Sequence, residues 1–319
     1  MWNYIVRRLI QGVFVLLIIT GVCFTLTRLS SDPMAQYANK QGMTAADREA
    51  IRHRLGLDQP LPVQYFSWLG LALQGELGDS FFSHLPVSTL LAQRLPMTLI
   101  LMITSEIFIV IFSVILGVVS AVRQYSWIDN LITSLSFVGY SMPIFFIAFG
   151  SIMIFAVQFK AWGLPYLPTG GDVWDFNNPA AMAWHLVLPV SCLVAIQTAG
   201  YSRYLRSSIL EVLRLDYVRT ARAKGLSERM VLYKHALQNA MLPFITILGL
   251  DIPFLLGGAL VTESIFTWPG MGRLFWEYAQ RGDYPVVIGV LLLVSTAVVF
   301  FTIVVDVAYT FVDPRIRLS

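Results

Sequence analysis

Three carboxylic acids lie within or beside long apolar stretches of this sequence, where a charged side chain is most able to do chemistry. Burying a carboxylate in an apolar medium is costly, so each should face water, a partner group or the interior of a helix bundle. Asp251 and Glu106 are therefore candidates for lining a polar path, although Glu106 could equally be a packed structural residue. Asp306 is expected to pair with a basic residue such as Arg315 or to cap a neighbouring backbone group. Three scattered acids are a weak signal for a proton relay.

Other reactive side chains do not form a catalytic pattern. The sequence has no G-x-S-x-G, no H-E-x-x-H and no G-x-x-x-x-G-K-[ST] motif. Its four histidines fall in four different segments: His53, His84, His185 and His235. Cys23 and Cys192 lie far apart in apolar stretches, where they are expected to pack as small residues. We therefore predict that the chain is not an enzyme and holds no metal or cofactor of its own.

The elements that position these residues must be membrane helices. Of 319 residues, 56% are hydrophobic and only 13% charged, and the mean hydropathy is +0.68, whereas soluble domains carry about 25% charged residues. Roughly twenty apolar residues in a helix cross a bilayer core, and only helices fit isolated apolar runs of this length. Six segments qualify, near residues 9–29, 97–122, 131–157, 184–204, 240–260 and 286–310. The first is too long for a cleavable signal peptide and should be retained.

Basic residues set the expected orientation. With both termini inside, the inner segments carry thirteen Lys and Arg in about sixty residues, and the outer segments carry nine, counting Arg28, in about twice that length. Both termini are therefore predicted to be cytoplasmic. Pro143 and Pro253 are expected to kink the third and fifth spans, and Pro189 and Gln197 make the fourth span the weakest of the six.

Two outer segments have predicted structure. Within residues 30–96 we expect a short amphipathic helix, a turn at Asp58-Gln59-Pro60 and an aromatic helix near the membrane surface. Residues 262–285 contain a Trp-Pro-Gly turn, an amphipathic helix and a second turn at Arg281-Gly282-Asp283. Either a re-entrant or surface-lying hairpin over the outer mouth of a path, or a plain interfacial helix, fits this second segment.

The most basic stretch, Asp216–Pro243, is expected in the cytoplasm. Asp216 can cap a short helix that ends at Gly225, and Ser227 can cap a second one. The spacing of a hydrophobic staple is present in Leu226 and Val231. Two short helices at a sharp turn favour a docking element for another protein, and the alternative is a solvated loop that only sets topology.

Several blocks of residues resemble a known family. The most specific are Arg206–Leu213 with Tyr217–Gly225, His235–Ala240 with Leu242-Pro243, and Glu263–Arg273 with Asp283-Tyr284-Pro285. Further similarity covers Tyr4–Gln11, Leu55–Asp58 with Pro60, Gly75–Ser80 and Arg94–Leu99. On these residues the chain resembles, from end to end, the permease subunits of bacterial peptide-type ABC importers, the branch that takes up dipeptides, oligopeptides, glutathione and nickel. It departs from the general form of the superfamily at Arg219-Thr220-Ala221, where Glu-Ala-Ala is usual, and at Leu29–Pro33.

The resemblance implies an all-α fold with six transmembrane helices of the type I importer class, in a bacterial cytoplasmic membrane. It implies a first helix in 1–30, an extracytoplasmic segment in 31–94, a permease domain in 95–310 with a coupling loop in 205–239, and a tail in 311–319. Its implied partners are a second permease, two ATPase subunits that bind ATP and Mg, an extracytoplasmic binding protein, a peptide substrate and membrane lipid, without nucleic acid.

Particular residues follow from the same resemblance. The positions carried over as ATPase-coupling residues are Arg219, Ala221, Arg222, Lys224, Gly225, His235, Asn239 and Pro243. Ala221 and Gly225, one helical turn apart, are expected to form a low ridge on the docking face. The positions carried over to an outer gate or a binding-protein contact are Glu263, Trp268, Pro269, Gly270 and Asp283. A rival function is a secondary transporter driven by an ion gradient, with Asp251 and Glu106 as coupling carboxylates.

Overall fold

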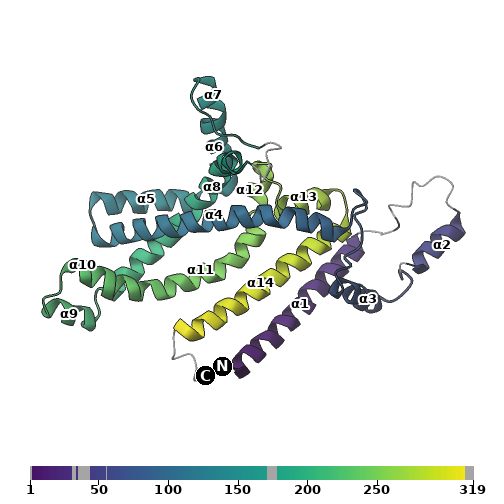
Figure 1. Ribbon diagram of the computed structural model, residues 1–319, viewed down its shortest axis with the longest axis horizontal. Coiled ribbons are helices and arrows are strands. Elements are labelled where there is room, and N and C mark those ends of the chain that lie inside the picture. The colour runs from purple at the N-terminus through teal and green to yellow at the C-terminus, as the bar shows by residue number, and fades with distance from the viewer. Residues whose placement is uncertain (1, 31–33, 35–43, 55, 171–177, 313–319) are drawn as a thin grey trace.

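The computed structural model describes the chain except residues 1, 31–33, 35–43, 55, 171–177 and 313–319. It also leaves out some side chains inside helices, including those of 250–258 and 306–312. The described residues fold almost entirely as helices (Figure 1), and their single β-bridge joins Asp79 to Pro86. Burial of long apolar runs with all backbone groups paired locally explains this all-α architecture.

Five helical segments of the described chain are long and apolar enough to cross a membrane. They belong to α1 (Trp2–Ser30), α4 (Val87–Val122), the rod of α6 (Ile144–Ser151), η2 (Ile152–Gln158) and α7 (Phe159–Ala161), α8 (Pro179–Val212) and α14 (Tyr284–Val312). The predicted fifth span coincides with α11 (Gln238–Gly258), a helix of 21 residues. Because side chains of its second half are outside the described set, the count of six spans stays a prediction.

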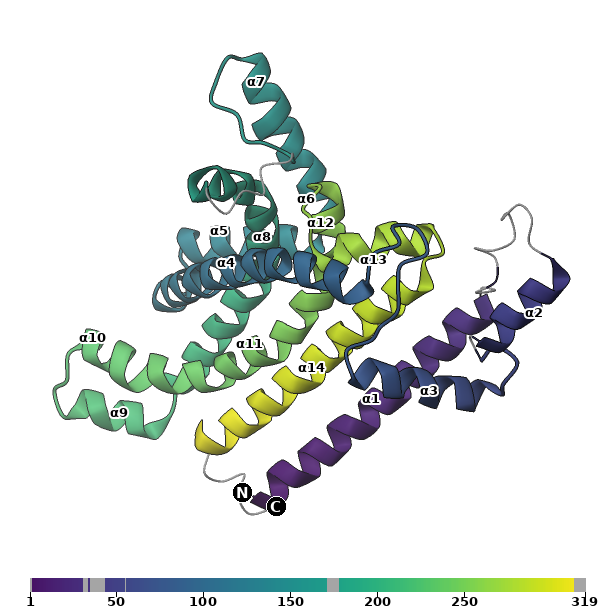
Figure 2. The same cartoon turned by 45° about the vertical axis from the view of Figure 1, so that its right-hand side comes forward.

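The long helices pack in sequence-distant pairs. In Figures 1 and 2, α11, α14 and α1 follow one another side by side, and α4, which packs on α8, is drawn above α11 in both views. The described ends of α1 and α14 that adjoin the chain termini lie at the same end of the bundle as the short helices α9 and α10. This agrees with the predicted placement of both termini and the basic stretch on one side.

The third predicted span is broken rather than kinked. Ser126 caps α5 (Trp127–Ser141), accepting a hydrogen bond from the Asp129 backbone N–H, and α6 begins after Pro143. A proline lacks a backbone N–H and disfavours helix in the residue before it, so the chain changes direction there. By contrast, α8 runs through Pro189 without interruption, and α11 continues past Pro253. The kink expected at Pro143 is therefore a complete break.

Short elements occupy the two ends of the bundle. On the side predicted to be extracytoplasmic, α2 (Ala45–Arg54) and α3 (Leu61–Leu73) follow α1, and α12 (Leu260–Ile265) and α13 (Met271–Gln280) precede α14. Tyr65 and Trp68 of α3 contact Phe24 of α1, as expected for an interfacial aromatic helix. On the other side lie α9 (Asp216–Ala223), α10 (Glu228–Met230) and the π-helical turn η3 (Val231–Leu237), which leads into α11.

The close contact between α4 and α8 depends on a glycine. A Cβ on Gly117 of α4 would lie 3.1 Å from the Ser202 carbonyl oxygen and 3.1 Å from Leu205 Cβ, both on α8. Small residues let membrane helices approach this closely. Leu205 also belongs to the buried cluster that joins α4, α8 and α11, with Ile109 and Phe244.

Replacing Gly117 by leucine should push α4 away from α8. We expect Gly117→Leu to lower stability by about 1–3 kcal/mol, the usual cost of overpacking, measured as a lower midpoint of thermal unfolding of the purified protein. Gly150→Leu is the matched control, because a Cβ at Gly150 meets no atom within 4 Å. Equal midpoints for the two variants would contradict the close-contact interpretation.

Candidate functional site

The basic stretch forms a compact element, which we call the knuckle and define as residues 216–237. It consists of α9, a turn, α10 and η3. Val218 and Val231 are fully buried and pack against each other, and Leu226 and the end of α8 at Val212 and Leu213 close this small core. The knuckle is thus attached to α8 by apolar packing, which a merely solvated loop would lack.

Capping of the knuckle is partly as predicted. Ser227 accepts a hydrogen bond from the Met230 backbone N–H, and Gly225 has φ +79° at the end of α9. Asp216, however, is the first residue of α9 rather than its cap: Leu215 stands at the cap position without a side-chain hydrogen bond. The acid still lies in the first turn, where the helix dipole favours it.

The predicted ridge of Ala221 and Gly225 does not form. Ala221 is only 6% exposed, because it faces Val218 and Val231 inside the knuckle. Gly225 lies beyond the end of α9 in a left-handed conformation, so the four-residue spacing no longer places the two residues on one face. Gly225 itself is exposed, and no atom lies within 4 Å of an added Cβ. The exposed apex of the knuckle is therefore the turn after α9.

Charged side chains surround this turn. Arg222 donates two hydrogen bonds to Glu228, from Nε to Oε1 at 3.0 Å and from Nη2 to Oε2 at 3.2 Å. Arg219 pairs with Asp216 at 3.3 Å. Both pairs are exposed, so each contributes at most about 1 kcal/mol. The Arg222 pair nevertheless bridges the two helices, and Lys224 carries a further exposed positive charge beside Gly225.

The remaining predicted coupling residues lie where the knuckle meets α11. The His235 carbonyl oxygen accepts hydrogen bonds from Asn239 Nδ2 at 2.7 Å and from Tyr217 Oη at 3.3 Å. The second bond links α9 to η3. Pro243 is exposed on the first turns of α11. The structure thus brings the predicted coupling positions together in and beside one element.

A buried ion pair anchors the helix that carries the knuckle. Arg206 of α8 donates to both carboxylate oxygens of Asp129 on α5, at 2.8 Å and 2.7 Å. Ser120 of α4 and the Tyr125 backbone N–H also donate to this carboxylate. The Asp129 side chain is 2% exposed and that of Arg206 24%. Arg206, Ser120 and the Tyr125 N–H together hold the pKa of Asp129 well below its usual range.

The residues predicted for an outer gate or a binding-protein contact are buried. Glu263 is completely buried, accepting hydrogen bonds from Thr98 Oγ1 at 2.8 Å and the Arg273 N–H at 3.0 Å. Burial raises the pKa of its carboxyl group. Trp268 donates from its indole to the Met97 carbonyl at 2.9 Å. These bonds fasten the hairpin of α12 and α13 to α4.

The other predicted gate residues are buried by close packing and by further hydrogen bonds. A Cβ on Gly270 would lie 2.2 Å from Oε1 of Glu263, and Pro269 is also buried. Asp283, 1% exposed, accepts from Ser80 Oγ at 2.6 Å and from the Phe82 N–H at 3.0 Å. Burial removes these side chains from direct contact with a binding protein, and a gate role for the hairpin remains a proposal.

The predicted path residues are not assembled into a site by the described structure. Glu106 lies on α4 with a partly buried side chain. The side chains of Asp251 on α11 and Asp306 on α14, and the whole of Arg315, fall outside the described residues. Their predicted roles stay predictions.

Sequence reasoning missed the partner of Arg206. A signal was available, because Ser126-Trp127-Ile128-Asp129 has the pattern of an N-cap with a carboxylate in the first turn of the helix, close to the end of the preceding helix. The contact between Ser80 and Asp283, 203 residues apart, left no local signal.

Comparison with known proteins matches the whole chain to transport permeases. Residues 113–318 match the family described as binding-protein-dependent transport system inner membrane component, and residues 1–102 match the family described as the N-terminal part of such a membrane component. The oligopeptide transport system permease protein AppB of Bacillus subtilis is 43% identical over 98% of this chain and 99% of its own length.

Other relatives are similar over their full length. A putative peptide permease protein of Brucella suis is 42% identical over all of both chains, and the glutathione transport system permease protein GsiC of Escherichia coli is 39% identical over 99% of both. A crystal structure of an amino acid ABC transporter with histidines has a TM-score of 0.53 at 16% identity, covering 70% of this chain and 94% of that one. This last likeness concerns the fold alone.

Breaking the Asp129 pair should destabilise the end of the bundle that carries the knuckle. We expect Asp129→Asn to cost about 3 kcal/mol, because the Arg206 charge loses its buried partner, as measured by thermal unfolding of the purified protein. Asp216→Asn, which removes an exposed ion pair, is the control and should cost less than about 1 kcal/mol.

The same pair predicts a dependence on pH. Because the folded-state pKa of Asp129 is lowered, its stabilisation is present above the ordinary Asp pKa of about 3.9 and is lost as pH falls further. The stability difference between wild type and Asp129→Asn should shrink below that pH. A difference that is absent at neutral pH would contradict the anchoring role.

Proposed function

The chain belongs to the family of binding-protein-dependent transport system inner membrane components, and from this premise we propose that it passes peptides across the bacterial inner membrane by alternating access. Five apolar helices of spanning length support its multi-pass placement in that membrane. The chain is the membrane permease of an ABC importer and not itself an enzyme. Hydrolysis of ATP is therefore the work of separate subunits, which would bind ATP and Mg.

The observation that carries the coupling proposal is the attachment of the knuckle. Val218, Val231 and the end of α8 share one small apolar core, so a push on the knuckle displaces α8 rather than a loose loop. Arg206, ten residues before α9, ties α8 to α5 through Asp129. A rigid chain of contacts therefore leads from the exposed turn at Gly225 into the helix bundle.

The exposed turn is suited to an acidic groove on an ATPase subunit. Lys224 precedes Gly225 directly, Arg219 adds an exposed basic side chain on α9, and the pair of Arg222 with Glu228 holds the two knuckle helices together. We propose that two ATPase subunits dock here and on the corresponding element of a second, homologous permease. ATP-driven closure of the ATPases would then rock the two permeases and open the path alternately to each side.

The proposed cargo is a short peptide supplied by an extracytoplasmic binding protein. Relatives that are 42–43% identical over nearly their entire length bear the names of a peptide permease and an oligopeptide permease. The glutathione permease, at 39% identity, also has a peptide as its named substrate. This agreement supports a di- or oligopeptide over other cargo.

The rival function, transport driven by an ion gradient through Asp251 and Glu106, has no support from these relatives. It predicts uptake driven by a proton or sodium gradient in vesicles that lack an ATPase. Such uptake at wild-type rate would overturn the proposal.

The knuckle proposal is tested by two substitutions at Gly225 in the complete transporter reconstituted in vesicles. Gly225→Trp should leave the chain inserted but reduce ATP-dependent uptake of a labelled tripeptide roughly tenfold or more. A bulky residue in the left-handed region costs about 1–3 kcal/mol and also obstructs the exposed turn.

Gly225→Asn is the matched control, because asparagine tolerates the left-handed conformation and is small. It should retain most of the uptake. Undiminished uptake by Gly225→Trp would remove the turn from the coupling interface. Retained ATP hydrolysis that responds to the binding protein in Gly225→Trp would contradict the coupling role as well.

A further inference from the structure

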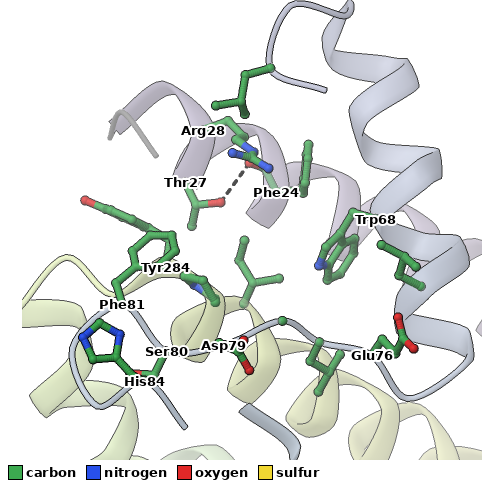
Figure 3. A pocket seen from close by; sticks show the side chains of 16 residues that line it. Phe24, Thr27, Arg28, Trp68, Glu76, Asp79, Ser80, Phe81, His84 and Tyr284 are labelled. Atoms are coloured by element: carbon green, nitrogen blue, oxygen red, sulfur yellow. Dashed lines mark hydrogen bonds between the residues drawn. The ribbon is translucent and has the colours of Figure 1, made fainter. Parts of the chain in front are cut away.

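A cavity of about 510 Å³ opens at the outer end of the molecule, away from the knuckle. It lies between the outer end of α1, helix α3, the loop of residues 75–86 and the start of α14 (Figure 3). None of the functions proposed above uses it. Its walls come from segments up to about 260 residues apart in the chain, so only the folded protein can form it.

Opposite charges face each other across this cavity. Figure 3 places Arg28, from α1, on one side, and Asp79 and Glu76, from the 75–86 loop, on the other. Among the described residues none of these three side chains forms an ion pair, and the Arg28 guanidinium instead lies 5.1 Å from the centre of the Phe24 ring. A half-buried cation without a counterion is costly beside apolar groups. The arrangement therefore complements a ligand with an anionic and a cationic group.

The rest of the lining is apolar and aromatic. Trp68, Tyr284 and Phe81 line the cavity together with leucines and Ile288. Trp and Tyr are typical of the membrane–water interface, and the cavity lies where α1 ends and α14 begins, at the outer ends of two spans. An amphipathic ligand with its polar group at this level and its apolar part below matches the lining.

The loop that carries the two carboxylates is held firmly. Ser80, which lines the cavity, is 1% exposed and donates to Asp283 at 2.6 Å. Arg281 stacks over Phe82 at 3.9 Å. The 75–86 loop is thus fixed to the turn between α13 and α14, and the cavity wall is preformed.

The surroundings favour a lipid over a peptide. Helix α1 lies at the edge of the row that it forms with α14 and α11: it packs on α14 and α3, and 11% of its apolar window is buried. Membrane lipid would contact the apolar face of α1 that no described element covers, directly beside the cavity. A peptide in transit should instead pass between the more buried helices at the centre of a transporter.

We propose that this cavity binds one zwitterionic phospholipid of the outer leaflet, with its phosphate on Arg28 and its ammonium group toward Asp79 and Glu76. Arginine forms short, charge-assisted hydrogen bonds to phosphate, which supply much of the specificity. The lipid fastens α3 and the 75–86 loop to α1 and α14, and so stabilises the outer segment in the membrane.

The test is native mass spectrometry of the purified complete transporter, with added phosphatidylethanolamine, phosphatidylglycerol or trialanine as probes. Wild type should bind one phosphatidylethanolamine in preference to phosphatidylglycerol. Arg28→Gln should weaken this binding roughly tenfold or more, the effect of losing a charge-assisted hydrogen bond. Arg52→Gln, at an exposed arginine of α2, is the control and should bind as wild type does.

A second variant keeps the charge and fills the space. Leu71→Trp, at a half-exposed lining residue, should also exclude the lipid while Arg28 is intact. Wild-type lipid binding by both Arg28→Gln and Leu71→Trp would overturn the site. Equal binding of phosphatidylglycerol would contradict the zwitterion assignment, and displacement of the lipid by trialanine would make the cavity a peptide site instead.

Discussion

The ion pair of Asp129 and Arg206 is the contact on which the half of this molecule that carries the knuckle depends. Taking two charges out of water is costly, and only good geometry and further hydrogen bonds offset that cost. Both conditions are met, because Arg206 contacts both carboxylate oxygens and Ser120 and the Tyr125 N–H donate to the same group. Three helices, α4, α5 and α8, therefore meet at one carboxylate. Helix α8 then continues into the knuckle, so the position of the proposed docking element is determined by this pair together with the apolar core around Val218.

A similar device operates at the outer end. Glu263 accepts hydrogen bonds from Thr98 Oγ1 and from the Arg273 backbone N–H of α13. Asp283 accepts hydrogen bonds from Ser80 Oγ and from the Phe82 N–H. Buried carboxylates thus fasten irregular segments at both ends, while close packing at small residues such as Gly117 holds the long helices between them. A bundle that is fixed at its ends in this way moves as a rigid body, which is what alternating access by rocking requires.

Prediction from sequence succeeded where the signal is local or repeats along a helix. Apolar length predicted the long helices, and the glycine and serine at Gly225 and Ser227 predicted the turn of the knuckle. Prediction from sequence failed where contacts between distant segments determine the structure. Ala221 packs inward against Val231 instead of facing solvent. A proline ends the helix at Pro143, whereas α8 continues through Pro189. The burial of Glu263 and Asp283 could not be predicted either, because their partners Thr98 and Ser80 lie far away in the chain.

The central claim is that the knuckle and the bundle move as one body. Its most direct test is a distance measurement between spin labels at Lys224, on the knuckle, and Arg123, at the exposed end of α4, in the complete transporter. Cys23 and Cys192 are first replaced by alanine, and Lys224 and Arg123 by cysteine, so that the spin labels attach to this chain only at the two introduced thiols. The account predicts one narrow distance distribution that is the same with and without ATP. A broad distribution, or one that shifts when ATP is added, would contradict it.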